Sequence, residues 1–82
     1  MKHIMYMEGE QAALSTIPHI EKSSYGTLEG AIATKQALID QFEEQFGYTR
    51  DMKDPDPKYA YNAGMLDKFK EIYESRGNKD ET

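Results

Sequence analysis

Apolar residues recur at intervals of three and four positions in two long segments, residues 28–46 and 59–76. This spacing is typical of α-helices that bury one face. The stretch between them, residues 49–57, carries prolines at positions 55 and 57. Each proline removes an amide donor and moves the preceding residue out of the helical conformation. The pattern therefore predicts an antiparallel hairpin of two long helices.

Residues with capping chemistry stand at the ends of both segments. Thr27 is placed to cap the first helix through its hydroxyl, and Gly47 can end that helix because glycine enters the left-handed conformation without steric cost. Asp56 and Pro57 predict the start of the second helix, as N-cap and first-turn proline. We expect this helix to stop at Gly77.

The first twenty residues allow two interpretations. Residues 1–7 could form a strand paired with residues 13–20, or a helix could begin near Glu8 and end before Pro18. The three-residue spacing of Leu14, Ile17 and Ile20 favours the helix. The predicted fold class is thus all-α, a small helical bundle made of the long antiparallel hairpin and a shorter N-terminal helical segment.

The apolar face of the last segment is wider than that of the first, ~200° against ~120° at about 100° per residue. Tyr61, Met65 and Ile72 make up the excess, which is more than one neighbouring helix can cover. Either the N-terminal segment or a partner protein must pack there. We favour the N-terminal segment, acting through its four large aliphatic residues, Ile4, Leu14, Ile17 and Ile20.

Three residues interrupt the helical patterns. Lys35 lies in the middle of the first apolar face, so its ammonium group must reach solvent or pair with an acid. Asn62 lies in the second face, where a hydrogen bond that fixes helix register is its expected use. Gly64 costs about 1 kcal/mol relative to alanine inside a helix. It marks either a tolerated penalty or a point where a partner approaches the backbone.

Composition limits the function classes. The 82 residues suffice for one domain, predicted as residues 1–77 with a disordered tail at 78–82. Cysteine is absent, which excludes disulfides and thiolate metal sites. The net charge of −5 disfavours nucleic acid as a partner, because phosphate contacts need a basic cluster. No apolar stretch is long enough for a signal peptide or a membrane span, so we expect a cytoplasmic protein without a membrane partner.

No catalytic constellation is visible in the sequence. His3 and His19 have no metal-ligand spacing, and the acids Asp51, Asp54 and Asp56 fit turn and cap chemistry better than a calcium loop. There is no nucleophile elbow and no glycine-rich phosphate loop. We therefore expect no enzyme activity, no cofactor and no metal.

Two groups of residues are the candidate protein-binding surface. The first is an acidic patch at the end of the first long helix, where negative charge opposes the helix dipole. The second combines the aromatic and basic residues of the linker with the wide face of the last helix, since tyrosine and arginine are enriched at binding hot spots. The candidates are Asp40, Glu43 and Glu44, and Tyr48, Arg50, Tyr59, Tyr61, Met65 and Ile72.

The function that fits these observations is a non-enzymatic protein-binding module, an adaptor or inhibitor of a larger protein. Small acidic proteins of this style are familiar among phage and mobile-element modulators of host enzymes. One alternative is a homo-oligomeric structural or assembly protein that pairs through the wide face of the last helix. A less favoured one is a nucleic-acid-binding accessory protein that uses the basic residues Arg50, Lys53, Lys58, Lys68 and Lys70.

Overall fold

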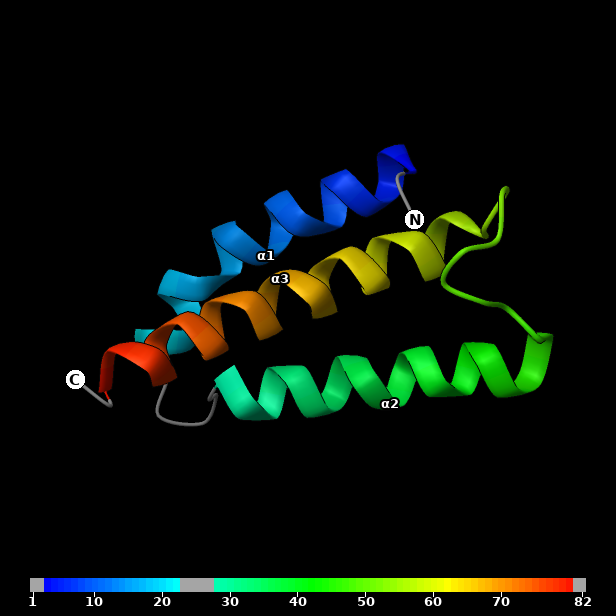
Figure 1. Ribbon diagram of the computed structural model, residues 1–82. Helices are drawn as coiled ribbons and strands as arrows, with labels where there is room; N and C mark the ends of the chain where they lie inside the picture. Colours follow the sequence, from blue (N-terminus) through cyan, green and yellow to red (C-terminus); the bar gives the residue numbers. More distant parts are fainter. Residues whose placement is uncertain (1–2, 23–27, 81–82) are drawn as a thin grey trace.

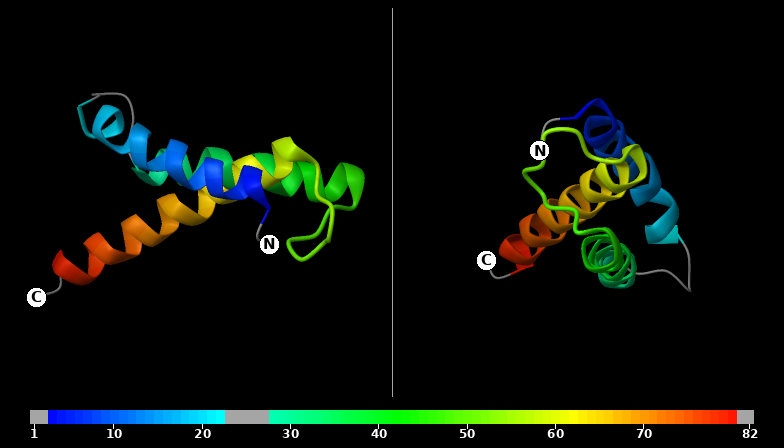
Figure 2. Two further views of the ribbon diagram at one scale, coloured as in Figure 1. Left: turned by 90° about the horizontal axis from the view of Figure 1, so that it is seen from above. Right: turned by 90° about the vertical axis from the view of Figure 1, so that its right-hand side faces the viewer.

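Three helices form the domain in the computed structural model, which describes residues 3–22 and 28–80 (Figure 1). They are α1 (Ile4–Lys22), α2 (Leu28–Phe46) and α3 (Pro57–Asp80). Helices α2 and α3 run antiparallel, and α1 crosses α3 at an angle (Figures 1 and 2). The described ranges contain no strand, so the predicted all-α bundle with its helical hairpin is confirmed. None of the described helices is both long and apolar enough to cross a membrane.

The predicted caps explain both ends of the hairpin connection. The Gly47 amide donates to the Glu43 carbonyl at 2.9 Å, and Gly47 has the left-handed φ of 70°, which ends α2 in an αL motif. The Asp56 carboxylate accepts from the Lys58 amide at 2.8 Å, and Pro57 is the first residue of α3. Both predicted boundaries are confirmed, whereas the Thr27 cap lies outside the described residues.

The predicted stop at Gly77 is wrong, because α3 continues to Asp80. Glycine can also adopt the right-handed helical conformation, at a cost of about 1 kcal/mol relative to alanine. A glycine therefore permits a helix end without enforcing one. Residues 78–80, expected in the tail, belong to the helix.

Helix α1 is longer than predicted, with 19 residues, the same length as α2. It begins before Glu8 because the His3 side chain acts as a cap: its Nδ1 accepts from the Met5 amide at 3.1 Å. It also continues through Pro18, which was predicted to end it. Pro18 lies on the exposed side, where water can bind the carbonyl of Leu14 that loses its amide partner.

Small residues allow α1 and α3 to approach each other closely. A Cβ atom added at Gly9 would overlap the Tyr61 carbonyl group, and one added at Gly64 would overlap the Tyr6 carbonyl group. The contact is reciprocal. Gly9 lies three residues after Tyr6, whose carbonyl contacts Gly64, and Gly64 lies three residues after Tyr61, whose carbonyl contacts Gly9. Ala13, four residues after Gly9, is also fully buried. Gly64 thus marks a backbone approach made by the chain's own first helix.

The wide face of α3 is covered by α1, as favoured from the sequence. Ala13, Met65 and Phe69 share one core cluster, with Ala12, Ile17, Tyr61 and Ile72 packed against it. The covering residues differ from those expected, however. Ile17 contributes, but Ile4 and Leu14 are 67% and 44% exposed, and the side chain of Ile20 lies outside the described part. The glycine and alanines of α1 carry the contact because only small side chains fit the close crossing.

A second core cluster holds α2 on α3. It contains Ile39, Tyr59, Ala63 and Leu66. Lys35 lies beside this contact and donates from Nζ to Oδ1 of Asn62 at 2.8 Å.

The bond between Lys35 and Asn62 bears on two expectations. Lys35 is half-buried, in agreement with an ammonium group that reaches toward solvent, and this group also donates to an amide oxygen. Asn62 also donates to the Lys58 carbonyl at 2.8 Å, so its side chain joins α2 to α3 at one position, as a register-fixing residue would.

Candidate functional site

The predicted binding residues separate into two groups. Tyr61, Met65 and Ile72 lie along the contact between α1 and α3, where Met65 is only 8% exposed and the other two are half-buried. Their apolar surface packs within the domain. The remaining six lie near the end of α2 and the linker that follows it, and the candidate site is built from that region.

Four aromatic rings gather where α2 ends. Phe42 lies 6.1 Å from Phe46 and 6.0 Å from Tyr59, measured between ring centroids, and Tyr48 lies 5.3 Å from both Phe46 and Tyr59. These separations are those of stacked and edge-to-face pairs, which stabilise beyond their buried area. Tyr59 is fully buried and Phe46 is 60% exposed, so the cluster runs from the core to the surface.

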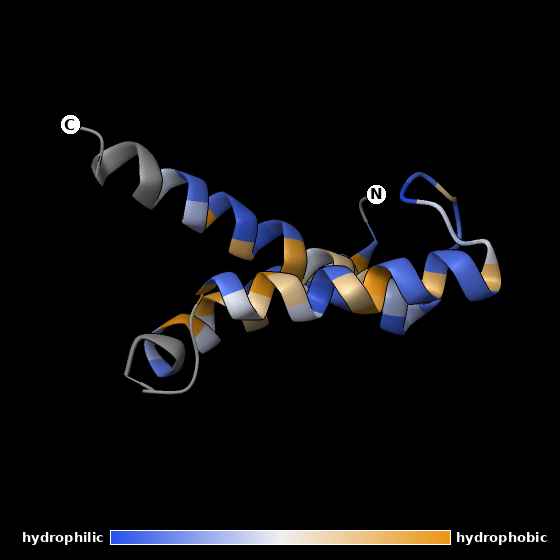
Figure 3. Ribbon diagram, turned by 90° about the horizontal axis from the view of Figure 1, so that it is seen from below, coloured by the Kyte–Doolittle hydropathy of each residue, from blue (hydrophilic) through white to orange (hydrophobic). Residues whose placement is uncertain are grey.

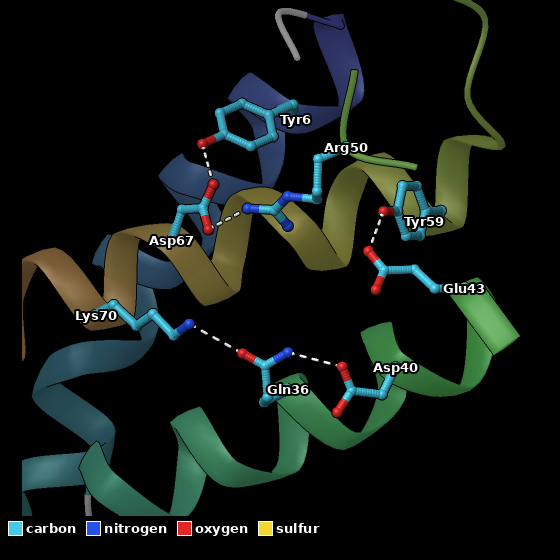
Figure 4. Close-up of polar contacts among 8 residues, drawn as sticks. All are labelled: Tyr6, Gln36, Asp40, Glu43, Arg50, Tyr59, Asp67 and Lys70. Atoms are coloured by element: carbon cyan, nitrogen blue, oxygen red, sulfur yellow. Dashed lines mark hydrogen bonds and ion pairs between the residues drawn. The ribbon is translucent and has the colours of Figure 1, made fainter. Parts of the chain in front are cut away.

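Arg50 connects the linker to helices α1 and α3 through Asp67. Its guanidinium group forms an ion pair with Asp67 of α3, and the Tyr6 hydroxyl of α1 donates to the second Asp67 oxygen at 2.5 Å (Figure 4). One carboxylate therefore joins the linker, α1 and α3. The sequence singled out Arg50 as a hot spot, but its charged group has a structural partner inside the domain.

Hydrogen bonds to carboxylates also shape the titration of two tyrosines. Burial raises the pKa of Tyr6, and its bond to the Asp67 carboxylate raises it further. Burial likewise raises the pKa of Tyr59, together with the 2.7 Å bond that its hydroxyl donates to Glu43. Both effects favour the neutral phenol in the folded protein, because ionisation would bring a second negative charge against a carboxylate.

The raised tyrosine pKa values predict a loss of stability in alkali. An unfolded tyrosine ionises near pH 10, while folded Tyr6 and Tyr59 retain their protons, so their contribution is fully present below about pH 10 and falls as pH rises above it. Each tyrosine should lower the free energy of unfolding by about 1.4 kcal/mol in total between pH 8 and pH 11, most of it above pH 10. Urea unfolding between pH 8 and 11 measures it. Tyr59→Phe should make the loss shallower, and an unchanged slope would contradict the assignment.

The three predicted acids have different surroundings. Glu43 is half-buried and accepts from Tyr59, whereas Asp40 and Glu44 are exposed. Asp40 accepts a hydrogen bond from the Gln36 amide at 3.0 Å, and the Gln36 side-chain oxygen accepts from Lys70 at 2.9 Å (Figure 4). Asp40 and Glu44 are thus the acids presented at the surface.

A hollow of about 200 Å³ lies on α2, on a different side of the helix from Asp40. Figure 3 views the molecule from the α2 side, where hydrophobic and hydrophilic segments alternate along the helix. The residues that line the hollow, called the α2 surface below, are Leu38, Gln41, Phe42, Gln45 and Phe46. Leu38, Phe42 and Phe46 belong to the apolar pattern of residues 28–46 and were not among the predicted binding residues. Their four-residue spacing was the available signal.

A larger hollow, about 460 Å³, lies between the first half of α2 and the last part of α3. Its polar side chains already bond one another. The Tyr73 hydroxyl donates to Glu29 at 2.5 Å, which raises the Tyr73 pKa, and Lys70 donates to Gln36. We therefore regard the α2 surface as the stronger candidate.

Helix α1 exposes an apolar stripe of its own. Ile4, Met7 and Leu14 are 67%, 56% and 44% exposed, and Gln11 continues their 3–4 spacing. This stripe, called the α1 stripe below, lies away from the glycine face that packs on α3.

Among the described residues, no group of three or more histidine, aspartate or glutamate side chains is arranged to hold a metal ion. Comparison with known proteins adds no assignment: no family model, curated protein or solved structure matches the chain.

Proposed function

We propose that this protein is a non-enzymatic protein-binding module, an adaptor or inhibitor of a larger protein, and that it binds through the α2 surface. The observation that carries the proposal is the hollow of about 200 Å³ beside the 60% exposed Phe46. Pockets for small molecules are larger, about 300–1,000 Å³. The volume suits one large side chain of a partner, and an exposed aromatic anchor is a common hot spot at protein interfaces.

The α2 surface is supported from within the domain. Phe42 and Phe46 contact Tyr48, and Tyr59 fixes the inner side of the aromatic cluster through its bond to Glu43. A binding surface that is held before the partner arrives loses less side-chain freedom on binding. This pre-organisation favours a docking role over a surface that merely happens to be apolar.

The basic residues offer weaker support for nucleic-acid binding. Arg50 pairs with Asp67, and Lys70 donates to Gln36. Lys68 lies 3.1 Å from Glu71 and 3.8 Å from Glu10. Three of the five candidate phosphate contacts thus already have partners in the domain.

We propose that the protein acts in the cytoplasm, and that it is a phage or mobile-element modulator of a host enzyme.

Site-specific crosslinking tests the α2 surface. A photoreactive phenylalanine analogue at Gln45 should crosslink a protein in extract of the source cells, whereas the same analogue at exposed Glu71 of α3 should not. Phe46→Ala in the same protein should abolish the Gln45 crosslink, because a central anchor typically contributes more than about 2 kcal/mol. Equal crosslinking at both positions, or none at Gln45, would contradict the proposal.

Self-association is a second candidate, favoured by the α1 stripe. Residues 4, 7, 11 and 14 follow the a and d positions of a heptad, the arrangement by which helices pair. A second copy of α1 could therefore cover Ile4, Met7 and Leu14. Light scattering of the purified protein decides this, since a mass of one chain, about 9.4 kDa, would exclude a stable dimer.

A further inference from the structure

We infer that the larger hollow, between the first half of α2 and the last part of α3, binds a small organic cation, an ammonium group joined to an apolar body. This site, called the α2–α3 hollow below, is lined by residues 29, 32, 33 and 36 of α2 and residues 70, 73 and 74 of α3. It shares no lining residue with the α2 surface. The inference therefore goes beyond the proposed function and does not depend on it.

The volume of the α2–α3 hollow suits a small molecule. Helix α3 diverges from α2 toward its C-terminal end, which leaves room between the two helices (Figures 2 and 3). The hollow measures about 460 Å³, within the usual range of small-molecule sites, about 300–1,000 Å³. A single side chain of a partner protein would leave much of this volume unfilled, so a whole small molecule fits it better.

One wall of the α2–α3 hollow is apolar. Ile32 and Ala33 contribute to it from α2, and Tyr73 contributes its ring from α3. Ile32 also packs against both core clusters, so this wall is held by the domain. Ligand sites combine such apolar walls with a few polar groups that orient the ligand. The face of an aromatic ring also attracts a cation.

The carboxylates of the α2–α3 hollow favour a positively charged ligand. Glu29 of α2 and Glu74 of α3 both line the hollow itself. One oxygen of Glu29 accepts from the Tyr73 hydroxyl at 2.5 Å, which leaves its other oxygen as an acceptor. Glu74 is exposed and has no polar partner within the described residues. An ammonium group supplies the donors that these oxygens accept, in charge-assisted hydrogen bonds.

Lys70 opposes this preference without reversing it. It is the one cation among the described lining residues, and its ammonium group donates to Gln36 at 2.9 Å. Gln36 donates in turn to a third carboxylate, Asp40, at 3.0 Å (Figure 4). Two acids against one base give the lining a net charge of −1, in a chain of net charge −5. Both values attract cations and repel anions.

Three probes of matched structure test the ligand class. Phenylbutylamine carries the ammonium group on an apolar body, phenylbutyrate carries a carboxylate on the same body, and butylamine, which resembles a lysine side chain, lacks the ring. In NMR titrations of isotope-labelled protein, phenylbutylamine should shift the backbone amides of residues 29–36 and 70–74. The other two probes should bind at least about tenfold more weakly.

Each contrary result overturns a stated part of the inference. An equal Kd for phenylbutyrate would remove the charge preference, and an equal Kd for butylamine would remove the need for an apolar body. Shifts confined to residues 38–46 would place the ligand on the α2 surface instead. No shift with phenylbutylamine would show that the hollow binds no such cation.

Neutral variants of the two carboxylates locate the site. Glu29→Gln combined with Glu74→Gln should raise the Kd of phenylbutylamine by about tenfold or more. The matched control, Glu8→Gln with Glu44→Gln, changes net charge equally at exposed positions outside the hollow and should alter the Kd by less than about threefold. Equal effects of both double variants would show a general charge attraction and overturn the inference. Circular dichroism confirms that each variant is folded.

Lys70→Gln should change the affinity in the opposite direction. The substitution removes the opposing charge, so the Kd of phenylbutylamine should fall by about threefold or more. The control Lys58→Gln, at an exposed position in the first turn of α3, should alter the Kd by less than about twofold. A Kd that rises or stays unchanged in Lys70→Gln would overturn the inference.

Discussion

Gly64→Ala is expected to destabilise the domain by more than about 3 kcal/mol, although alanine is the better helix former by about 1 kcal/mol. The added Cβ atom would overlap the carbonyl oxygen of Tyr6 and lie 2.9 Å from its carbonyl carbon. These are backbone atoms of α1, which cannot move aside by a change of rotamer. The helices must separate, and separation uncovers the core cluster around Met65 and Phe69.

Thermal unfolding measures this effect, since each kcal/mol corresponds to about 4–8 °C in a domain of this size. The melting temperature of Gly64→Ala should fall by more than about 12 °C. Thr34→Ala, at an exposed position of α2, is the control and should change stability by less than about 0.5 kcal/mol. A melting temperature at or above that of the unchanged protein would show that α1 does not cross α3 at Gly64.

Gly9→Ala provides an independent check on the same contact. The crossing is reciprocal, so the new Cβ atom would overlap the Tyr61 carbonyl group and lie 3.1 Å from the Met65 amide. The loss should be similar to that of Gly64→Ala. The double variant should lose less than the sum of the two, because separation of the helices relieves both overlaps at once.

The hairpin was predictable because its signals are local. Asp56 caps α3 by accepting from the amide of Lys58, two residues later, and Gly47 ends α2 through its own left-handed φ. The start of α1 was missed because a histidine cap is not among the usual N-cap residues. The continuation of α1 through Pro18 was missed because it depends on the Leu14 carbonyl being exposed to water, and the sequence does not show which side of α1 faces α3. Local signals identified the helices, but they were not read correctly at the start of α1, at Pro18 or at the end of α3.

The helix crossing was not predictable from apolar periodicity. Gly9 and Gly64 are 55 positions apart in the sequence and contribute no side chain to an apolar stripe. Large residues such as Ile4 and Leu14 dominate a periodicity argument, yet they remain exposed. The close contact is possible because neither glycine has a Cβ atom, and only the three-dimensional structure shows which helix packs against each glycine.

The candidate site was predictable in part, for a similar reason. The sequence identified the aromatic linker and the acids, but Arg50 could not be assigned without knowing that Asp67, 17 residues away, lies beside it. The extent of the packing along α2 was also missing. Ile39 is 2% exposed in the core, whereas Phe46, two turns later on the same side of the helix, is 60% exposed. Phe46 is the last residue of α2, so its position along the axis separates it from the core residue.

Truncation of the three phenylalanines to alanine should separate the core from the binding surface. Phe69 is 1% exposed, so Phe69→Ala should cost about 3–5 kcal/mol and leave the domain close to unfolded. Phe42, half-buried at the rim of the α2 surface, should cost less than Phe69. Phe46, 60% exposed, should cost less than about 1 kcal/mol. Urea unfolding of the three variants gives this order directly, and each serves as the chemical control for the others.

Binding should follow a different order from stability. Phe46→Ala removes the exposed wall of the hollow, so this folded variant should lose the Gln45 crosslink. A large loss of stability in Phe46→Ala would instead make Phe46 a core residue and remove the basis for the α2 surface. Unchanged binding in a stable Phe46→Ala variant would move the search to the α1 stripe, where large apolar side chains also face solvent at helical spacing.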